Sequence, residues 1–338
     1  MKPLSRRCRN VEADYVRLIY TLFDKFEQEQ MASSHRGRPF TYAHKLLIVF
    51  FTIMHFRRIF RFKAQRRWLE CHPDMAKEIG FQSIPHRTTL SRRYKKLAAV
   101  VQAFVAFLGQ WAEGLDEAFN SDSLYEDKSL FKAQGPVWHQ SDREAGLIPA
   151  GLRNLDTDAS WCKSAYHGWV YGYGLHLTCN RQGFPKLVRV ETASVFESQV
   201  LDEKGPQIQQ LEPTNLVGDD GYTKYQRIRA WAKQGVALLT PALNWTKGRY
   251  ARACHRFIGE PENAALLADR KTAVEPFFDL ISKVLDTTDN HKQLPIKGLA
   301  NVRTFLTLGV LTVQIAMIAN SIWGLPLREI SHMAAVFT

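Results

Sequence analysis

Apolar residues recur along this chain with two different periods, which separate a helical first third from a mixed remainder. In residues 11–30 the apolar positions are three or four residues apart, at Val11, Tyr15, Leu18, Ile19 and Leu22. This spacing predicts an amphipathic helix. The segment Gly37-Arg38-Pro39-Phe40 interrupts the pattern, and the apolar run Leu46–Phe56 that follows predicts a helix at the core of this region.

The segment from Pro73 to Leu97 carries the start and stop signals of two short helices. A helix over residues 74–79 is expected to end at Gly80, and Thr88 and Thr89 can begin a second, strongly basic helix. The pair is typical of a helix-turn-helix that places its second helix in a DNA groove, although the connector exceeds the usual three or four residues. A solvated basic helix accounts for the same charges. If the segment binds DNA, the expected phosphate contacts are Arg87, Arg92, Arg93, Lys95 and Lys96.

From residue 124 the alternation changes to a period of two, which predicts strands. The run Leu124–Phe131 is a half-buried strand, and an irregular stretch follows over residues 132–164. The later elements are predicted as a hairpin of residues 168–178 and 186–192, a helix over 197–211, a strand over 214–219, a helix over 223–234 and a strand over 235–240. With a final helix around Glu275, this order predicts an α+β or α/β fold with an RNase H-like mixed sheet.

Three acidic residues occupy informative places in this order. Asp127 lies in the first strand, Asp219 at the end of a short apolar strand, and Glu275 on a helix whose apolar stripe includes Val274 and Phe277. A single carboxylate in a sequence is usually solvated surface. Three at such positions suit two hard cations, Mg²⁺ or Mn²⁺, held for an in-line displacement at phosphorus.

Several stretches resemble the DDE insertion-sequence transposases, which have an RNase H-like core. They are Asp127–Ala133 with Val137–His139, Tyr166–Gly172, Gly218–Tyr222, Arg270–Phe278 and the apolar segment after Gly298–Val302. The resemblance covers most of residues 40–323. It implies that Asp127, Asp219 and Glu275 are the catalytic acids that bind two Mg²⁺ or Mn²⁺ ions for strand cleavage and strand transfer. Asp219 is preferred to Asp220 because the family aspartate lies three residues before a tyrosine, here Tyr222.

The chain departs from the family pattern at two points. Many relatives carry an arginine four residues before the glutamate and a lysine seven after it, where this chain has Lys271 and Ser282. Arg270 and Lys283 lie one residue further out, so cations for DNA phosphates are still expected from Arg270, Lys271 and Lys283. Asp122 is the alternative first aspartate, and Asp127 is preferred because it lies inside the alternating run.

The charge is distributed unevenly along the 338 residues, whose formal net charge is +12. Residues 1–110 contain 21 Lys or Arg and 8 Asp or Glu, whereas residues 111–338 contain 24 and 25. We therefore expect a basic DNA-binding module over 1–115, a catalytic core over 116–325 and a tail over 326–338. A basic protein that binds acidic partners or a membrane surface is the alternative.

Two further groups of residues suggest contacts with DNA. Arg249, Arg252 and Arg256 are spaced to share one helical face, which would hold DNA near the acids or be an ordinary solvated face. Trp138 and Trp161, in the irregular stretch, are candidates for stacking on an unpaired base. Trp169, Tyr171 and Tyr173 alternate along one strand and are expected to pack in the core.

The remaining signals concern compartment and membrane. Five cysteines without a C-x-x-C pair or a signal peptide favour a reducing cytoplasmic location, associated with the nucleoid, over disulfides or structural zinc. The apolar stretch Phe305–Trp323 is long enough to span a membrane, but its Thr, Gln, Asn and Ser residues favour a buried helix.

Together with these patterns, the resemblance implies a DNA transposase that recognises double-stranded terminal inverted repeats through its basic module. The core would cut a phosphodiester at each end and join the 3′-OH to target DNA. An RNase H-like nuclease without strand transfer, or an inactive DNA-binding derivative, remains an alternative. A homodimer is expected in the DNA complex, because two ends must be processed together.

Overall fold

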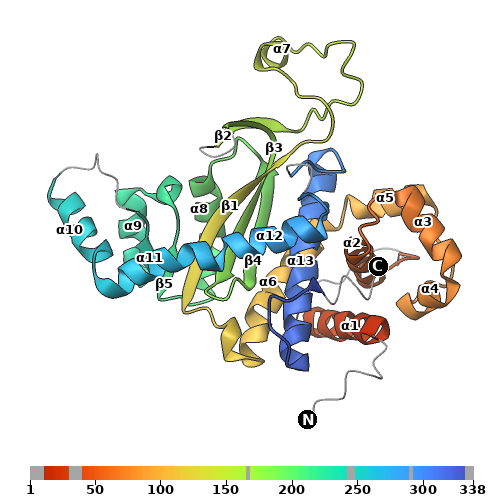
Figure 1. Ribbon diagram of the computed structural model, residues 1–338, viewed down its shortest axis with the longest axis horizontal. Helices are drawn as coiled ribbons and strands as arrows, with labels where there is room; N and C mark the ends of the chain where they lie inside the picture. The colour runs from red at the N-terminus through yellow and green to blue at the C-terminus, as the bar shows by residue number, and fades with distance from the viewer. Residues whose placement is uncertain (1–10, 30–39, 165–167, 242–247, 289–291, 332–338) are drawn as a thin grey trace. The chain divides into compact units, whose positions relative to one another are not determined.

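A computed structural model describes residues 11–29, 40–164, 168–241, 248–288 and 292–331, without the side chains of Val11, Arg249 and Tyr250. The predicted breaker Gly37–Pro39, the residues Tyr166 and His167, and residues 332–338 of the tail lie outside these ranges. The chain forms two compact units. Unit 1 contains residues 1–108 and 280–338, and unit 2 contains residues 109–279 (Figure 1).

Unit 1 is helical, and the long apolar C-terminal helix lies at its centre. The N-terminal helices are α1 (Val11–Glu29), α2 (His44–Phe56), α3 (Phe62–Cys71), α4 (Pro73–Ile79), α5 (Arg87–Tyr94) and α6 (Ala98–Trp111). Helices α1 and α2 pack against α13 (Leu299–Trp323), whose residues from Thr304 to Asn320 are buried. The helix predicted over 46–56 is confirmed as α2, of which residues 47–56 are buried.

The polar residues of α13 have partners in the N-terminal helices of the same unit. Thr304 donates to the Tyr94 carbonyl at 2.9 Å, and Gln314 donates to the Val105 carbonyl at 3.0 Å. Helix α13 is long and apolar enough to cross a membrane, but 89% of its most apolar window is buried inside the protein. The helix therefore has the environment of a core helix.

A buried histidine makes the stability of unit 1 dependent on pH. His55 contacts the carbonyl oxygens of Phe51 and Phe305 at 2.8 and 3.3 Å, and burial lowers its pKa to about 4. Below about pH 6.5 the unfolded chain binds a proton that the folded unit does not, so stability is full above that pH and falls toward pH 4 by up to about 1.4 kcal/mol per pH unit. Calorimetry of the wild-type chain and His55→Gln should show the larger loss in the wild type. Equal losses would contradict this assignment.

Helices α4 and α5 confirm the two short helices predicted for residues 73–97. Gly80 ends α4 with a φ of 101°, a left-handed conformation that favours glycine, and α5 begins after the connector 81–86. On α5 the side chains of Arg87 and Arg92, and of Lys95 and Lys96 just after it, are exposed. Arg93 departs from the expectation of a phosphate contact, because it donates to the Tyr42 carbonyl and stacks 3.6 Å from the Phe40 ring centroid.

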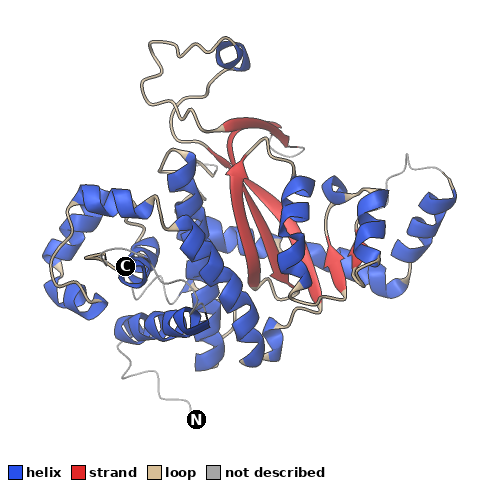
Figure 2. Ribbon diagram, turned by 180° about the vertical axis from the view of Figure 1, so that it is seen from behind, coloured by secondary structure: helices blue, strands red, loops and turns tan. Residues whose placement is uncertain are grey.

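Unit 2 is built on a six-stranded mixed sheet, which confirms the predicted RNase H-like α and β fold (Figure 2). The strands are β1 (Ser123–Lys132), β2 (Ser160–Ser164), β3 (Gly168–Asn180), β4 (Pro185–Thr192), β5 (Asn215–Val217) and β6 (Ala237–Leu239). The order is β2-β3-β1-β5-β6, with β4 also paired to β3. Strands β1, β5 and β6 run parallel, whereas β3 is antiparallel to its neighbours.

The helices of unit 2 that follow the hairpin include those predicted, with one further helix between the last strand and Glu275. They are α8 (Glu197–Gln209), α9 (Tyr225–Ala232), α10 (Arg249–Ile258), α11 (Pro261–Ala273) and α12 (Glu275–Val284), which continues into unit 1. The segment around Glu275, predicted as one helix, is divided between α11 and α12 at Val274. Glu275 is therefore the first residue of a helix.

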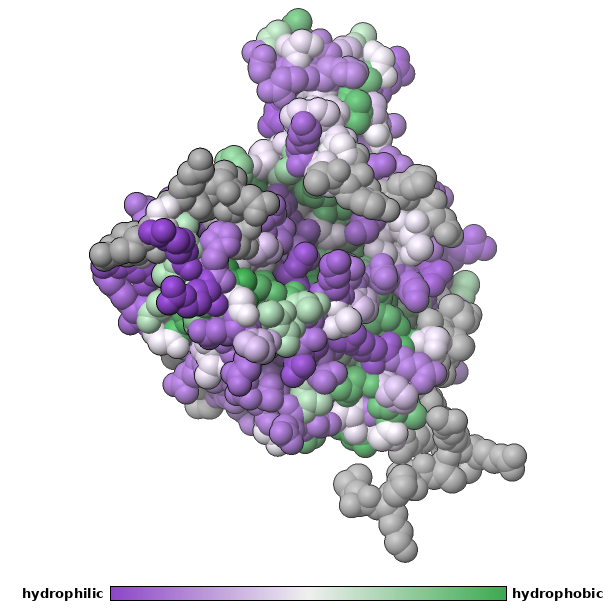
Figure 3. All heavy atoms as spheres, turned by 60° about the vertical axis from the view of Figure 1, so that its left-hand side comes forward, coloured by the Kyte–Doolittle hydropathy of each residue, from purple (hydrophilic) through white to green (hydrophobic). Residues whose placement is uncertain are grey.

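The stretch predicted as irregular, 132–164, contains the short helix α7 (Gln140–Glu144) and strand β2, and it projects from the sheet (Figure 1). The Trp138 indole donates to the Leu147 carbonyl at 2.9 Å, and the Trp161 indole donates to the Trp138 carbonyl at 2.7 Å. Both candidate stacking residues thus hold the loop together. Leu147, in the loop after α7, is 62% exposed. Figure 3 shows apolar side chains at the end of this projection.

The alternating aromatic residues of β3 do not share one environment. Tyr171 and Tyr173 are buried as predicted, with their hydroxyls donating to the backbone and the carboxylate of Asp156. The expectation for Trp169 was wrong, since its side chain is 66% exposed at the start of the strand. Its exposed ring is the more accessible stacking surface of the set.

Candidate active site

Asp127 and Asp219 belong to neighbouring parts of the sheet. Tyr125 of β1 lies opposite Val217, the last residue of the parallel strand β5, and each aspartate follows two residues later. The charge of Asp219 acts on the pKa of Asp127, so the two carboxylates lie in the same region. Strand β5 ends at Val217, so Asp219 lies at the carboxyl end of a parallel strand, where α/β sheets place their sites.

The backbone around Asp219 depends on two glycines. A Cβ on Gly218 would lie 2.7 Å from the ring of Tyr222, which is fully buried, so this ring can pack only against a glycine. The Asp219 carboxylate accepts a hydrogen bond of 2.9 Å from the Gly221 N–H and begins a short 3₁₀ turn over Asp220–Tyr222. The motif Gly218–Tyr222 thus fixes the direction of Asp219.

Arg270 of α11 supplies a positive charge to the aspartate pair. Its guanidinium donates to Asp127 Oδ2 at 2.9 Å, while Asp127 Oδ1 accepts from the Lys128 N–H at 2.8 Å. Arg270 lowers the pKa of Asp127 and of Asp219, so its charge acts on both. The Arg270 guanidinium therefore balances part of the negative charge of the two aspartates.

The raised pKa values of these acids show that burial and mutual repulsion disfavour their charged forms. Burial raises the pKa of Asp127 to about 6, and the charges of Asp219 and Glu126 add to this against the effect of Arg270. Burial also raises the pKa of Asp219. Hard carboxylate oxygens that repel one another in one region are a donor set that fits a divalent cation of the Mg²⁺ or Mn²⁺ type.

Glu126, on the opposite face of β1 from Asp127, forms a buried ion pair. Lys204 of α8 donates to both Glu126 oxygens at 2.6 and 2.7 Å, and Thr178 of β3 donates to Oε2 at 2.6 Å. Burial raises the pKa of Glu126 and lowers that of Lys204, and each shift is opposed by the other residue's charge. The pair fixes α8 and β3 against the residue that precedes Asp127.

Glu197, the first residue of α8, is an acid of this region that sequence reasoning missed. Burial raises its pKa to about 7, and the charges of Asp219, Asp127 and Glu126 add to this effect. The polar start of a helix gave no reason to single it out. The topology could have indicated it. Helix α8 connects the β3–β4 hairpin to β5, so its first residue is expected near β1 and β5.

Glu275 and Asp122 are both exposed, Glu275 on the first turn of α12 and Asp122 just before β1. Among the described residues, no group of three or more His, Cys, Asp or Glu side chains is arranged to hold a metal ion. A hydrogen bond and charge effects join Asp127, Asp219 and Arg270, and none of the described hydrogen bonds or ion pairs joins Glu275 to them.

The other predicted DNA-binding residues are placed at the surface. Arg252 and Arg256 are exposed on α10, Lys271 is exposed on α11, and the side chain of Arg249 is not described. Hydrophilic side chains dominate the side of unit 2 that carries α9, α10 and α11 (Figure 3).

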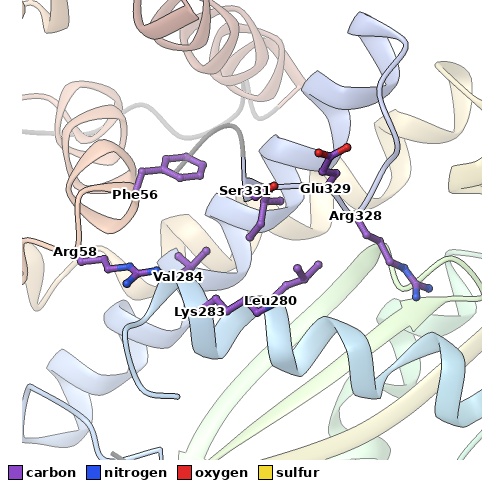
Figure 4. Close-up of a pocket in the computed structure, with 9 residues that line it drawn as sticks. Phe56, Arg58, Leu280, Lys283, Val284, Arg328, Glu329 and Ser331 are labelled. Atoms are coloured by element: carbon purple, nitrogen blue, oxygen red, sulfur yellow. The ribbon is translucent and has the colours of Figure 1, made fainter. Parts of the chain in front are cut away.

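Lys283 lines a cavity of about 400 Å³ within unit 1, together with Phe56, Leu280 and Arg328 (Figure 4). The walls come from the end of α2, from α12 and from the segment after α13. The acids of unit 2 are not among the lining residues, so this cavity is not the candidate active site.

Comparison with known proteins agrees with this geometry. Residues 127–301 match the family model described as a transposase DDE domain, which covers more than half of the chain. The match begins at Asp127, so Asp122 precedes it. Searches of the curated proteins and of the solved structures found no match. On the strength of the family match, the chain belongs to the DDE transposases.

Proposed function

We propose that this protein is a DNA transposase that cuts the ends of its insertion sequence and joins them to target DNA. The observation that supports this most directly is that Asp127 of β1 and Asp219, two residues beyond the end of the neighbouring strand β5, lie close enough for Arg270 to act on both. The family match supports the reaction class, and the two carboxylates are our candidates for its site.

The acids of unit 2 would hold two Mg²⁺ or Mn²⁺ ions, with Asp127 and Asp219 as ligands and Glu275 as the third acid of the family set. Such ions, when bound, activate the attacking oxygen and stabilise the leaving oxygen of a phosphodiester. Arg270 would release Asp127 and turn to a DNA phosphate, which the same guanidinium binds by charge-assisted hydrogen bonds. Lys271, exposed one residue later, would contact the same backbone.

Unit 1 would recognise the inverted repeats of double-stranded DNA. Four exposed cations lie on or just after α5, namely Arg87, Arg92, Lys95 and Lys96. Phosphate contacts of this kind give affinity that falls steeply with salt. Arg252 and Arg256 of α10 and Lys283 would add contacts, two copies would process the two ends together, and the reaction would take place in the cytoplasm, where the DNA is.

Removal of the metal tests this function. The substrate is a DNA fragment that contains the gene with its flanking sequence on both sides, since an insertion-sequence gene lies between its own ends. With Mg²⁺ or Mn²⁺ we expect breaks on both sides of the gene, and with EDTA a rate lower by at least ~10³-fold. Cleavage that persists in EDTA, or breaks without relation to the gene, would contradict the proposal.

A further inference from the structure

Glu197 lies against the turn that carries Asp219. A Cβ on Gly221 would be 2.7 Å from Glu197 Oε2 and 3.1 Å from Asp219 Oδ1. The two carboxylate oxygens therefore flank one point, and they can do so because residue 221 has no side chain. Gly221 does not have a positive φ, so its backbone conformation alone does not require glycine there.

The residue after Asp127 holds the segment that leads to Glu197. Lys128 Nζ donates to the carbonyl oxygens of Ala193 and Val195, at 3.0 and 2.9 Å. These carbonyls belong to the connection between β4 and α8, which ends at Glu197. Strand β1 thus carries one acid of the site and fixes the backbone of another, so the position of Glu197 is built into the sheet.

Helix α8 is also anchored further along from Glu197. Lys204 binds Glu126 inside the unit, so the part of α8 from Glu197 to Lys204 is held at both ends. A helix start held in this way keeps the backbone of Glu197 beside Asp219 when a cation binds, which reduces the ordering cost of binding.

We propose that Glu197 is a metal-binding residue of the active site and shares a divalent cation with Asp219. The reaction in which Glu197 would take part rests on the proposed function. The position of Glu197 is set by Gly221, Lys128 and α8. Glu197 adds a carboxylate that the described structure already places beside Asp219. The ligand is a hard divalent cation that keeps water molecules for a phosphate to displace.

Mn²⁺ binding to the full-length protein, followed by electron paramagnetic resonance, tests this role without DNA. We expect Glu197→Gln to weaken Mn²⁺ binding by at least ~10-fold, comparable to the effect of losing a supporting partner of a metal site. Glu197→Asp should recover part of the affinity because it keeps a carboxylate. Glu203→Gln is the matched control, since Glu203 is exposed on the same helix and contacts only Gln199 among the described hydrogen bonds.

Gly221→Ala provides a second variant that retains every acid. Its Cβ would enter the point between Glu197 and Asp219, so we expect weaker Mn²⁺ binding with an unchanged thermal unfolding profile. Mn²⁺ affinity within twofold of wild type in Glu197→Gln, or no Mn²⁺ binding by the wild type, would overturn the inference. Glu197-dependent Mn²⁺ binding without any DNA cleavage would instead refute the proposed function and leave this inference standing.

Discussion

Asp127→Asn and Asp219→Asn should each reduce Mg²⁺-dependent cleavage of the element's ends by at least ~10³-fold, equivalent to about 4 kcal/mol of activation free energy. Both substitutions keep the shape of the side chain and remove the charge that a divalent cation requires. Folding should be preserved, because the carboxylates are buried and repel one another. Cleavage rates at saturating Mg²⁺ and an unfolding curve for each variant are the measurements.

The neighbouring acids supply matched controls for these two variants. Asp122→Asn and Asp220→Asn change carboxylates that are close in sequence to Asp127 and Asp219, and both proteins should cleave at nearly the wild-type rate. An inactive Asp122→Asn with an active Asp127→Asn would show that the first aspartate had been misassigned. The same comparison at Asp219 and Asp220 tests the second assignment.

Lys204→Met should destabilise unit 2 by about 3–5 kcal/mol, because it leaves the Glu126 carboxylate buried without its cation. Both side chains of the pair are fully buried, so water cannot replace the lost partner. For a unit of this size the loss corresponds to a melting temperature lower by about 10 °C. Denaturant unfolding followed by circular dichroism gives the free energy.

The double variant Glu126→Gln/Lys204→Met distinguishes the stability that comes from the interaction of the two residues from the contribution of each residue alone. Removing both charges leaves no unpaired ion, and the amide oxygen introduced at position 126 can still accept from Thr178, so most of the stability should return. A double variant that is destabilised by the sum of the two single effects would show that the residues act independently. The stability assigned to their interaction would then be wrong.

The elements that positioned the acids were predictable because their patterns are local. The alternation around Asp127 predicts β1, and the apolar run before Gly218 predicts β5. Each pattern can be recognised because it lies within one strand. The parallel pairing of β1 with β5, which brings the segments of Asp127 and Asp219 together, joins residues 92 positions apart, and no local pattern records it. The resemblance to the DDE transposases is what predicts that Asp127 and Asp219 share one site.

The features that were missed depend on tertiary contacts. Glu197 has its place because Lys128 fixes the preceding backbone and Gly221 leaves room, and neither contact is visible in the helix itself. In the sequence Arg93 is one of five candidate phosphate contacts. In the structure it lies over the Phe40 ring and donates to the Tyr42 carbonyl inside unit 1. Trp169 has the alternation of a core residue, but it lies at the exposed start of β3.

Strand transfer tests the proposed transposase function most directly. Pre-cleaved element ends with free 3′-OH groups are incubated with the wild-type protein, Mg²⁺ and a target plasmid, and the joined products are sequenced. We expect 3′ ends joined to target DNA, with no product in EDTA or with Asp219→Asn. Cutting of the target without joining would identify a nuclease, and Mg²⁺-independent binding without either reaction would identify an inactive DNA-binding derivative; either result would contradict the proposed function.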